Sequence, residues 1–236
     1  GKFVEIKHEG ADIALSVEVG GVVEKHVAEK LLVAAGRRPS IEDLKLENIG
    51  VKLEKGKIQF NENTLQTDNP DVFVAGDVTG RYQILHYASE MGKVAGANAG
   101  GAFPEKEMDY TMLKMGVIFS EPQVAFVGLT EREAKEKKID VVSSTLNLPE
   151  IGRGLLEEHR TGLWKLLARK GDGLLLGAQA LGPSPHSEWF VDLIRWLVYF
   201  KGTVHDLTHK KPYYHPTWPE LLQSMGSELL EKIKRD

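Results

Sequence analysis

Histidine is the residue type best suited to acid–base chemistry in this sequence, which holds eight histidines and no cysteine. The lack of cysteine excludes a disulfide framework, a thiolate nucleophile and a thiolate metal cage. His205, His209 and His215 fall within one stretch of eleven residues and raise the question of a metal site. The lysine pair and proline at 210–212 interrupt any helix between His209 and His215 and would place positive charge beside a cation. We therefore predict no metal site.

The segment 215–220, which reads His-Pro-Thr-Trp-Pro-Glu, gives one histidine a more specific setting. A threonine at 217 is a good N-cap and a proline is tolerated in a first helical turn, so His215 is expected just before a helix. Two interpretations follow for Glu220. It can complete a capping box with Thr217, which the local sequence alone favours. Alternatively, it can turn back to His215, fix the tautomer of the ring and make it a base that works near neutral pH.

The first part of the chain predicts an antiparallel ribbon followed by a layered α/β region. Apolar and polar residues alternate from 3 to 19, with turn signals at Glu9-Gly10 and Gly20-Gly21. Uniformly apolar runs at 31–35 and 72–75 predict strands that are covered on both faces. A helical pattern then runs from about 86 to 98.

The pattern of predicted strands and helices changes after a domain boundary near residues 100–104. Thr130 opens a predicted helix, and Glu133 three residues later completes a capping box. Strands followed by helices indicate an α+β module with an antiparallel sheet. The predicted strands are 115–119, 123–127, 141–148, 162–169 and 174–180, and the predicted closing helices are 187–200 and 217–233.

The predicted helix at 187–200 is apolar on nearly all sides, whereas a surface helix needs only an apolar stripe. A sheet can cover one flank of such a helix, and a partner subunit is the expected cover for another. The alternative is that loops of the same chain bury it. The pattern therefore indicates a homodimer.

Composition excludes several classes of protein. Thirty basic and thirty-four acidic residues give a net charge of −4, with no basic patch for a phosphate backbone, so we expect no nucleic-acid partner. A hydrophobic share of 42% and a charged share of 27% predict a folded protein rather than a disordered one. No run approaches the ~20 apolar residues that cross a bilayer, so we expect no membrane partner and a cytoplasmic location.

Four segments in order along the chain resemble the flavoprotein pyridine nucleotide-disulfide oxidoreductase family. The His-Pro-Thr at 215–217 followed by Glu220 is similar to the C-terminal signature of that family. Residues 33–39 resemble the end of its NAD domain, and 67–77 resemble its second flavin motif. Residues 119–131 are similar to the opening of its dimerisation domain. The resemblance thus covers nearly the whole chain.

The resemblance implies cofactor contacts in the first part of the chain. Asp77 is expected to bind the ribityl chain of FAD, because acids at strand ends and open helix amides suit such a ligand. The alternative for Asp77 is a turn residue that caps 78–80. Gly36 matches a position near the bound nicotinamide cofactor, or merely ends a strand. The backbone expected to approach the isoalloxazine comprises Gln83, Ile84, Leu85 and His86.

For His215 and Glu220 the resemblance implies catalysis. The matched histidine is the acid–base for a thiol pair on the partner subunit, and the matched glutamate orients it. It accepts a proton from a dithiol substrate as the thiolate attacks the enzyme disulfide, and electrons then pass to FAD and on to NAD. Such a site is complete only across a dimer.

The sequence departs from the family in two respects. It contains no G-x-G-x-x-G and no cysteine pair, and full members run to roughly twice its length. We therefore expect FAD and NAD(P) in the complete enzyme but neither retained by this chain. The missing N-terminal half is expected in cis or as a separate chain. The expected organisation is a remnant of the NAD domain with the returning part of the FAD domain (1–107), followed by the dimerisation domain (108–236).

The prediction for function is the C-terminal part of a dithiol/disulfide oxidoreductase that is incomplete for catalysis alone. A dihydrolipoamide dehydrogenase-like protein is favoured over a mercuric reductase, since the vicinal cysteine pair that ends mercuric reductases is absent. The alternative is a non-catalytic homodimerisation module.

Overall fold

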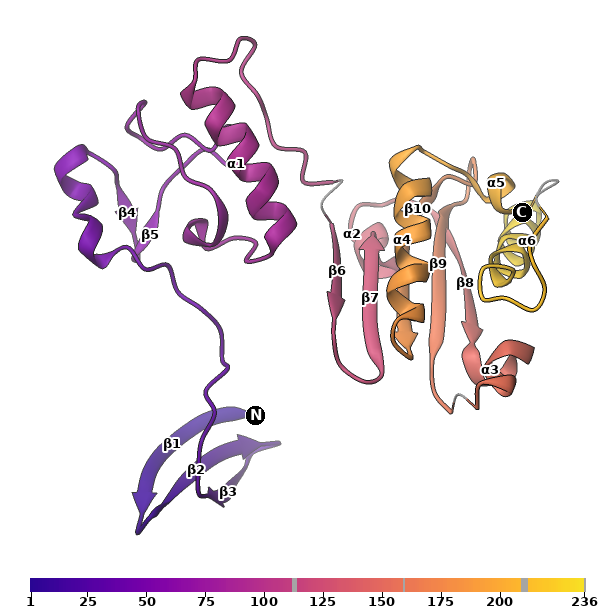
Figure 1. Cartoon of the computed structure of the whole chain (residues 1–236), viewed down its shortest axis with the longest axis horizontal. Helices are drawn as coiled ribbons and strands as arrows, with labels where there is room; N and C mark the ends of the chain where they lie inside the picture. The colour runs from indigo at the N-terminus through magenta and orange to yellow at the C-terminus, as the bar shows by residue number, and fades with distance from the viewer. Residues whose placement is uncertain (112–113, 159, 209–211, 236) are drawn as a thin grey trace.

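The computed structural model describes residues 1–111, 114–158, 160–208 and 212–235. Figure 1 shows three units in chain order: a small sheet at the N-terminus, a unit built around helix α1, and a larger unit that ends at the C-terminus. Across these described residues, no helix is long and apolar enough to cross a membrane.

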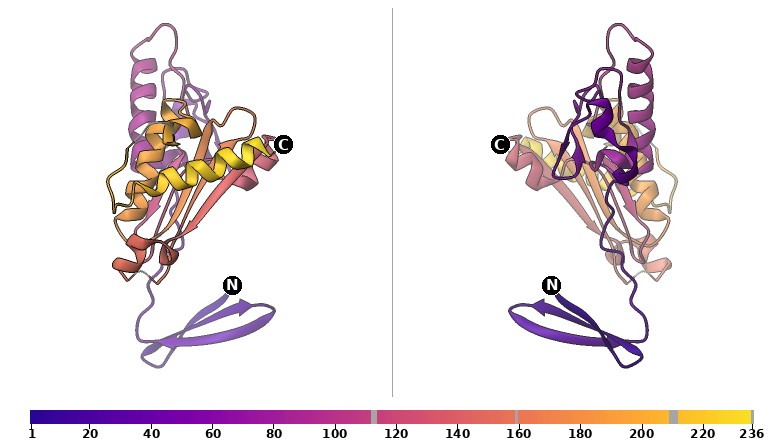
Figure 2. Two further views of the ribbon diagram at one scale, coloured as in Figure 1. Left: turned by 90° about the vertical axis from the view of Figure 1, so that its right-hand side faces the viewer. Right: turned by 90° about the vertical axis from the view of Figure 1, so that its left-hand side faces the viewer.

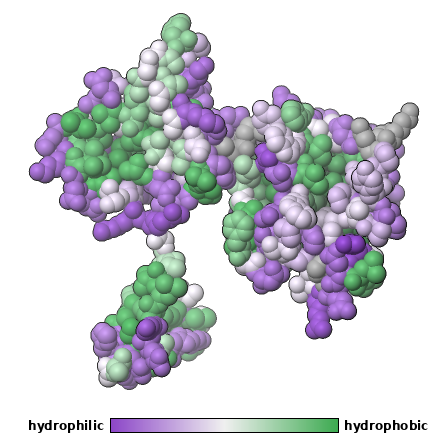
Figure 3. All heavy atoms as spheres, in the orientation of Figure 1, coloured by the Kyte–Doolittle hydropathy of each residue, from purple (hydrophilic) through white to green (hydrophobic). Residues whose placement is uncertain are grey.

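The N-terminal unit is a three-stranded antiparallel sheet of β1 (Lys2–Glu9), β2 (Asp12–Val19) and β3 (Val22–Ala28), in the order β1-β2-β3. The predicted ribbon is therefore present, and Gly20-Gly21 turns the chain into a third strand that the alternation pattern did not include. Only Ala14 is buried, and apolar side chains gather at the surface of this sheet (Figure 3). The unit thus has no core of its own.

The predicted strands at 31–35 and 72–75 do not form. Residues 31–35 lie in an extended connection without strand pairing, and Leu32 and Val33 are 89% and 72% exposed. A buried parallel strand needs neighbours on both sides, and none of the described strands pairs with this run. In the second run, Phe73 makes one isolated antiparallel bridge to Gln66, and Val74 is buried. That segment therefore pairs locally rather than in a parallel sheet.

The middle unit is built from short elements and one long helix. The predicted helix at 86–98 is confirmed as α1 (Leu85–Ala99). Leu65, Tyr87, Met91, Ala95 and Met108 form one buried cluster on it. A second cluster lies beneath the short elements. These elements are η1 (Glu42–Leu44), η2 (Leu46–Ile49), β4 (Leu53–Glu54), β5 (Lys57–Ile58) and η3 (Gly76–Thr79).

The C-terminal unit is a five-stranded antiparallel sheet in the order β6-β7-β10-β9-β8. Its five predicted strands are confirmed, with ends that differ by one or two residues. The strands are β6 (Met115–Ile118), β7 (Gln123–Gly128), β8 (Val141–Asn147), β9 (Leu163–Arg169) and β10 (Leu175–Gly182). The short helices η4 (Leu148–Glu150) and α3 (Gly152–Leu156) lie between β8 and β9, and α5 (Val204–Thr208) follows later in the chain.

Two helices, α4 (His186–Tyr199) and α6 (Leu221–Lys234), pack on the sheet and share one hydrophobic core with it (Figure 2). The face of α4 that carries Phe190, Val191 and Ile194 is buried in this core. The opposite face, with Trp189, Leu193, Trp196, Tyr199 and Phe200, is 45–71% exposed. Loops of the described chain therefore do not cover the second face of α4.

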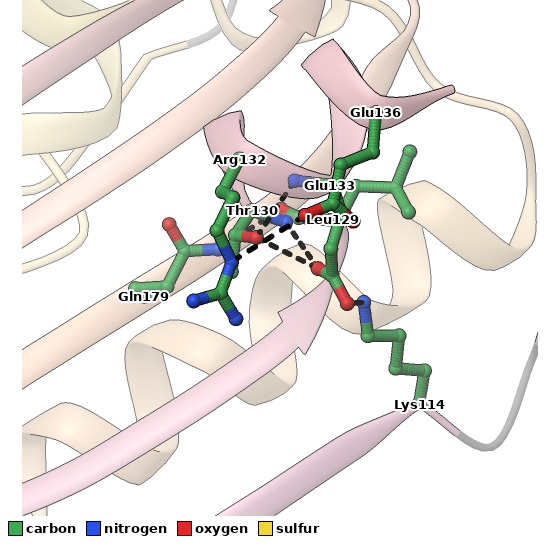
Figure 4. Close-up of polar contacts among 7 residues, drawn as sticks. All are labelled: Lys114, Leu129, Thr130, Arg132, Glu133, Glu136 and Gln179. Atoms are coloured by element: carbon green, nitrogen blue, oxygen red, sulfur yellow. Dashed lines mark hydrogen bonds and ion pairs between the residues drawn. The ribbon is translucent and has the colours of Figure 1, made fainter.

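The predicted capping box begins α2 (Glu131–Glu136). Thr130 accepts a hydrogen bond from the Glu133 backbone N–H, and the Glu133 carboxylate accepts one from the Thr130 N–H at 2.9 Å. The other oxygen of this carboxylate is ion-paired with Lys114, just before β6 (Figure 4). Burial acts to raise the pKa of Glu133, but the hydrogen bonds from Lys114 and Thr130 outweigh it and hold the pKa at about 2.

Candidate functional site

A histidine–carboxylate pair lies in the loop before α6. The Nδ1 atom of His215 lies 2.8 Å from Oε2 of Glu220. The side chain of His215 is 82% exposed, whereas that of Glu220 is 24% exposed. The exposed ring is thus held from one side by a largely covered carboxylate.

The loop that carries this pair is anchored on both sides of the histidine. The Tyr213 hydroxyl donates to the Leu207 carbonyl at 3.0 Å, and the Thr217 hydroxyl donates to the Tyr214 carbonyl at 2.6 Å. Trp218 is buried in the core of the C-terminal unit, with its ring centroid 5.5 Å from that of Trp164. Contacts on both sides of His215 therefore fix the loop and keep the histidine exposed, although the loop is neither a helix nor a strand.

The structure places Glu220 in contact with His215 and not in a helix cap. Helix α6 begins at Leu221 rather than at the predicted Thr217, and no side chain caps its first turn. The Thr217 hydroxyl is engaged with Tyr214 instead. The predicted capping box at 217–220 is therefore wrong. Residues 215–220 form turns and a bend, and the bonds that lead into the helix join the N–H groups of 221, 222 and 223 to carbonyls three residues earlier.

A carboxylate that accepts a hydrogen bond from Nδ1 fixes the tautomer of an imidazole ring. When Nδ1–H donates to Glu220, the proton is held on that nitrogen and Nε2 is left as the basic atom. A ring so oriented can accept a proton at Nε2 and return it. The pair can therefore act as an acid–base towards a group brought to the exposed edge of the ring.

The second candidate region is the segment from Asp77 to the start of α1. Gly76 has a φ of 75°, and a Cβ there would lie 3.3 Å from the Cβ of Ala88 on α1. Glycine therefore allows η3 to lie against α1, and its N–H contacts the buried sulfur of Met91 at 3.3 Å. The carbonyl of Asp77 accepts the Gly80 N–H, but its side chain does not cap the turn.

Arg37 contacts two of the residues predicted to bind cofactor. Its Nη1 lies 2.8 Å from Oδ2 of Asp77, and its Nη2 donates to the Gln83 carbonyl at 3.0 Å. The sequence alone assigned Arg37 no role, although Arg37 directly follows Gly36 in the segment 33–39 that resembles the end of an NAD domain. A carboxylate has two oxygens, so this ion pair leaves one oxygen of Asp77 for a further donor.

The remaining predicted residues lie at the beginning of α1. Ile84 is the N-cap residue of α1 and its side chain makes no capping hydrogen bond. The side chains of Ile84 and Leu85 are 40% and 82% exposed. The ring of His86 lies 4.9 Å from that of Tyr87. Exposed apolar side chains at the start of a helix are suited to contact one edge of a flat ring such as a flavin.

Gly36 has a φ of 113° and no neighbouring atom within 4 Å of a Cβ built on it. Because residues 31–35 form no strand, Gly36 does not end one. Its backbone conformation favours glycine and sets the direction in which Arg37 leaves the connection.

The three late histidines, His205, His209 and His215, are the sequence candidates for a metal site. His209 lies outside the described residues. Within the described part of the chain, no three His, Asp or Glu side chains are grouped so that they could hold a metal ion.

Family models match the chain on both sides of the connection between α1 and β6. The model of the pyridine nucleotide-disulphide oxidoreductases matches residues 2–92, and the model of the dimerisation domain of these proteins matches residues 115–225.

Curated relatives include two kinds of enzyme. The chain is 35% identical over 207 residues to a mercuric reductase of Staphylococcus aureus, an alignment that covers 87% of this chain and 37% of the relative. It is 34% identical over 183 residues to a dihydrolipoyl dehydrogenase of Bacillus subtilis, covering 78% of this chain and 38% of the relative. The chain therefore spans well under half the length of these relatives.

Solved structures show the same fold. LpdA from Mycobacterium tuberculosis superposes with a TM-score of 0.80 at 20% identity, covering 96% of this chain and 48% of LpdA. The Cu(II) complex of the flavoprotein disulfide reductase RclA from Escherichia coli gives 0.80 at 21% identity, covering 97% of this chain and 50% of RclA. These neighbours confirm the predicted fold class, an α/β FAD/NAD(P)-binding region followed by an α+β dimerisation domain.

Proposed function

The chain belongs to the pyridine nucleotide-disulphide oxidoreductase family, and from that premise we propose that it is the C-terminal part of a flavin-dependent dithiol/disulfide oxidoreductase. In this proposal residues 108–236 form the dimerisation domain and residues 1–107 supply part of the cofactor-binding region. The observation that carries the proposal is the 2.8 Å contact between His215 and Glu220 beneath an exposed imidazole edge.

The proposed chemistry is proton transfer by His215. Nε2 of His215 accepts the proton of a substrate thiol, and the resulting thiolate attacks a disulfide sulfur of the partner subunit. The S–S bond breaks as the new S–S bond forms, and the departing sulfur leaves as a thiolate. Glu220 keeps the ring oriented and stabilises it while it carries the extra proton. Because this sequence has no cysteine, the disulfide must come from another part of the complete enzyme.

Flavin and nicotinamide nucleotide supply the reversible two-electron transfer of such an enzyme when they are bound. The residues of this chain fit one part of the flavin. Asp77 would bind a ribityl hydroxyl, and the backbone of 83–86 would lie against the ring. The sequence has no G-x-G-x-x-G to cradle a pyrophosphate, so the remaining contacts must come from elsewhere. We therefore propose that the chain alone retains neither FAD nor NAD(P) and is inactive.

The proposed partner is a second copy of this chain, bound through the exposed aromatic face of α4. Three aromatic rings contact one another on this face, with centroids 5.0–6.1 Å apart. They belong to Trp196, Tyr199 and Phe200. Aromatic side chains dominate the energetics of protein interfaces, and such a surface is costly to leave in water. Dimerisation would also bring His215 to a site on the other subunit.

A dithiol rather than mercuric ion is the proposed substrate class. Relatives of both kinds match this chain to a similar degree. The contact between His215 and Glu220 suits proton transfer from a thiol, and this favours the dithiol class.

The acid–base role is tested by His215→Gln in the complete, FAD-loaded enzyme that contains this chain. We expect the dithiol half-reaction to slow by about 10²-fold or more, with the dimer intact. Reduction of an artificial acceptor by NADH, which bypasses the thiol step, should be unchanged. The control is Tyr214→Phe, which alters the neighbouring exposed side chain. Unchanged dithiol turnover in His215→Gln would remove the proposed role.

A second candidate function, a non-catalytic homodimerisation module, is favoured by one observation: the C-terminal unit has a complete core of its own. Both functions predict a colourless dimer for the purified 236-residue chain. Flavin absorbance at one per chain would contradict the proposal that the chain retains no FAD. Dithiol turnover on addition of the missing portion would contradict the non-catalytic module.

A further inference from the structure

The guanidinium group of Arg37 joins the two ends of the turn that carries Asp77. Its Nη1 lies 2.8 Å from Oδ2 of Asp77, and its Nη2 donates to the Gln83 carbonyl at 3.0 Å. A planar guanidinium can engage two acceptors at once, whereas a lysine ammonium is a single point charge. Arg37 therefore links the start of η3 to the segment that leads into α1.

The turn between these two acceptors is itself ordered by short-range hydrogen bonds. The Gly80 N–H donates to the Asp77 carbonyl at 3.0 Å, and the Thr79 hydroxyl donates to the Gly76 carbonyl at 2.7 Å. These bonds fix the backbone of the turn, but they do not engage the Asp77 side chain. The contact that holds the carboxylate comes from Arg37.

The connection that carries Arg37 packs against the same turn. A Cβ built on Gly80 would lie 3.7 Å from Cγ of Pro39. Ile41 is buried in the cluster that also contains Val74. Because both Pro39 and Ile41 follow Arg37 closely in the chain, the backbone next to the arginine is held in place. The guanidinium group therefore reaches the carboxylate from an anchored segment.

One oxygen of the Asp77 carboxylate remains for a ligand. Arg37 contacts Oδ2, a carboxylate has two oxygens that accept hydrogen bonds, and the Asp77 side chain is 49% exposed. A side chain that is already oriented binds its ligand without losing rotational freedom at that moment. The contact with Arg37 thus leaves an oriented acceptor, which suits the hydroxyl group of a polyol chain.

We propose that Arg37 is a positioning residue, which orients the Asp77 carboxylate to accept a hydrogen bond from a ribityl hydroxyl of FAD. This inference rests on the flavin contact proposed above. Arg37 acts through Asp77 and need not touch the cofactor. The neighbouring Arg38 provides a matched comparison, because it pairs with Glu42 at 3.3 Å and its side chain is 88% exposed.

The contact itself is tested in the purified chain by ¹⁵N NMR of the arginine guanidinium groups. Because both Nη groups of Arg37 are engaged, rotation about its Nε–Cζ bond should be slow, and the two groups should give separate signals at low temperature. In Asp77→Ala these signals should merge. The exposed Arg38 should give a merged signal in both proteins. Merged Arg37 signals in the unsubstituted chain would overturn the inference.

The effect on flavin is tested by titrating FAD into the apo form of the complete enzyme that contains this chain. Arg37→Gln should weaken FAD binding by about 3- to 10-fold. Arg37→Lys keeps the charge but cannot span both acceptors, so it should weaken binding as well. Arg38→Gln removes the same charge from the next residue and should change the affinity by less than about 2-fold. Full affinity in Arg37→Lys, tighter binding in Arg37→Gln, or equal losses in Arg37→Gln and Arg38→Gln would contradict the positioning role.

A double-mutant cycle separates this inference from the proposed function. Asp77→Ala should weaken FAD binding by about 10-fold or more, and adding Arg37→Gln to it should cause no further loss. If Asp77→Ala leaves FAD affinity unchanged, the flavin contact in the proposed function is wrong. If Asp77→Ala weakens binding but Arg37→Gln does not, or if Arg37→Gln causes the same loss with and without Asp77, the positioning inference is wrong.

Discussion

The Glu133 carboxylate is the most strongly stabilised acid at the start of α2, and its removal makes a quantitative test of the fold. Its side chain is 28% exposed, and it receives hydrogen bonds from Lys114 Nζ and from the Thr130 N–H and hydroxyl. These contacts outweigh burial and lower the pKa of Glu133 from 4.5 to about 2. The difference corresponds to about 3 kcal/mol of stability in favour of the charged form.

The sign of the pH dependence follows from that direction. Because the pKa of Glu133 is lower in the folded state than in the unfolded state, the stabilisation is fully present above pH 4.5 and is lost as the pH falls towards 2. We expect Glu133→Gln to reduce the free energy of unfolding by about 2–3 kcal/mol at pH 7. Because the site is partly exposed, solvent screens these contacts, and the loss of stability should not exceed the roughly 3 kcal/mol that corresponds to the pKa shift. The difference from the unsubstituted protein should shrink steadily below pH 4.5.

The assay is urea unfolding at a series of pH values, followed by the fluorescence of the buried Trp164 and Trp218. Protein concentration is kept constant because the proposed dimerisation would couple to stability. Glu136→Gln is the control on the same helix, since its carboxylate is 66% exposed and lies 3.9 Å from Arg132. It should change stability by less than about 0.5 kcal/mol. Equal losses in the two variants, or a Glu133→Gln loss that persists undiminished at pH 2, would refute the reasoning.

Two further substitutions test the packing of the C-terminal unit and its outer face. Gly128 has a φ of 68°, and a Cβ there would lie 2.1 Å from a carbonyl oxygen of β10. Gly128→Ala should therefore reduce the free energy of unfolding in urea by about 3 kcal/mol or more. The control Gly171→Ala, at an open position, should reduce it by less than about 1 kcal/mol. Trp196→Glu should raise the dimer dissociation constant at least about 100-fold in sedimentation experiments, because it buries an unpaired charge. Gln223→Glu adds the same charge at an exposed position of α6 and should leave the proposed dimerisation unchanged. Equal effects of the two substitutions would argue against α4 as the interface.

Local patterns in the sequence predicted several features that depend on residues close in the chain. Glu133 lies three residues after Thr130 in the capping box, and the helical pattern that predicted α1 lies within one continuous segment. Such features need no knowledge of distant segments, since the backbone geometry of one turn or one strand brings the partners together. The pairing of His215 with Glu220 was predicted from the family resemblance, whereas the local sequence alone favoured a capping box.

Tertiary structure alone decided which of several local possibilities is realised. The sequence allowed Glu220 either to cap a helix or to contact His215. In the folded chain, where Tyr213 and Trp218 anchor the loop, Glu220 contacts His215. Arg37 reaches Asp77 from forty residues away, a contact that depends on the path of the chain. The apolar run at 31–35 does not form a strand, because hydrophobicity favours burial but only a neighbouring strand can complete the backbone hydrogen bonds.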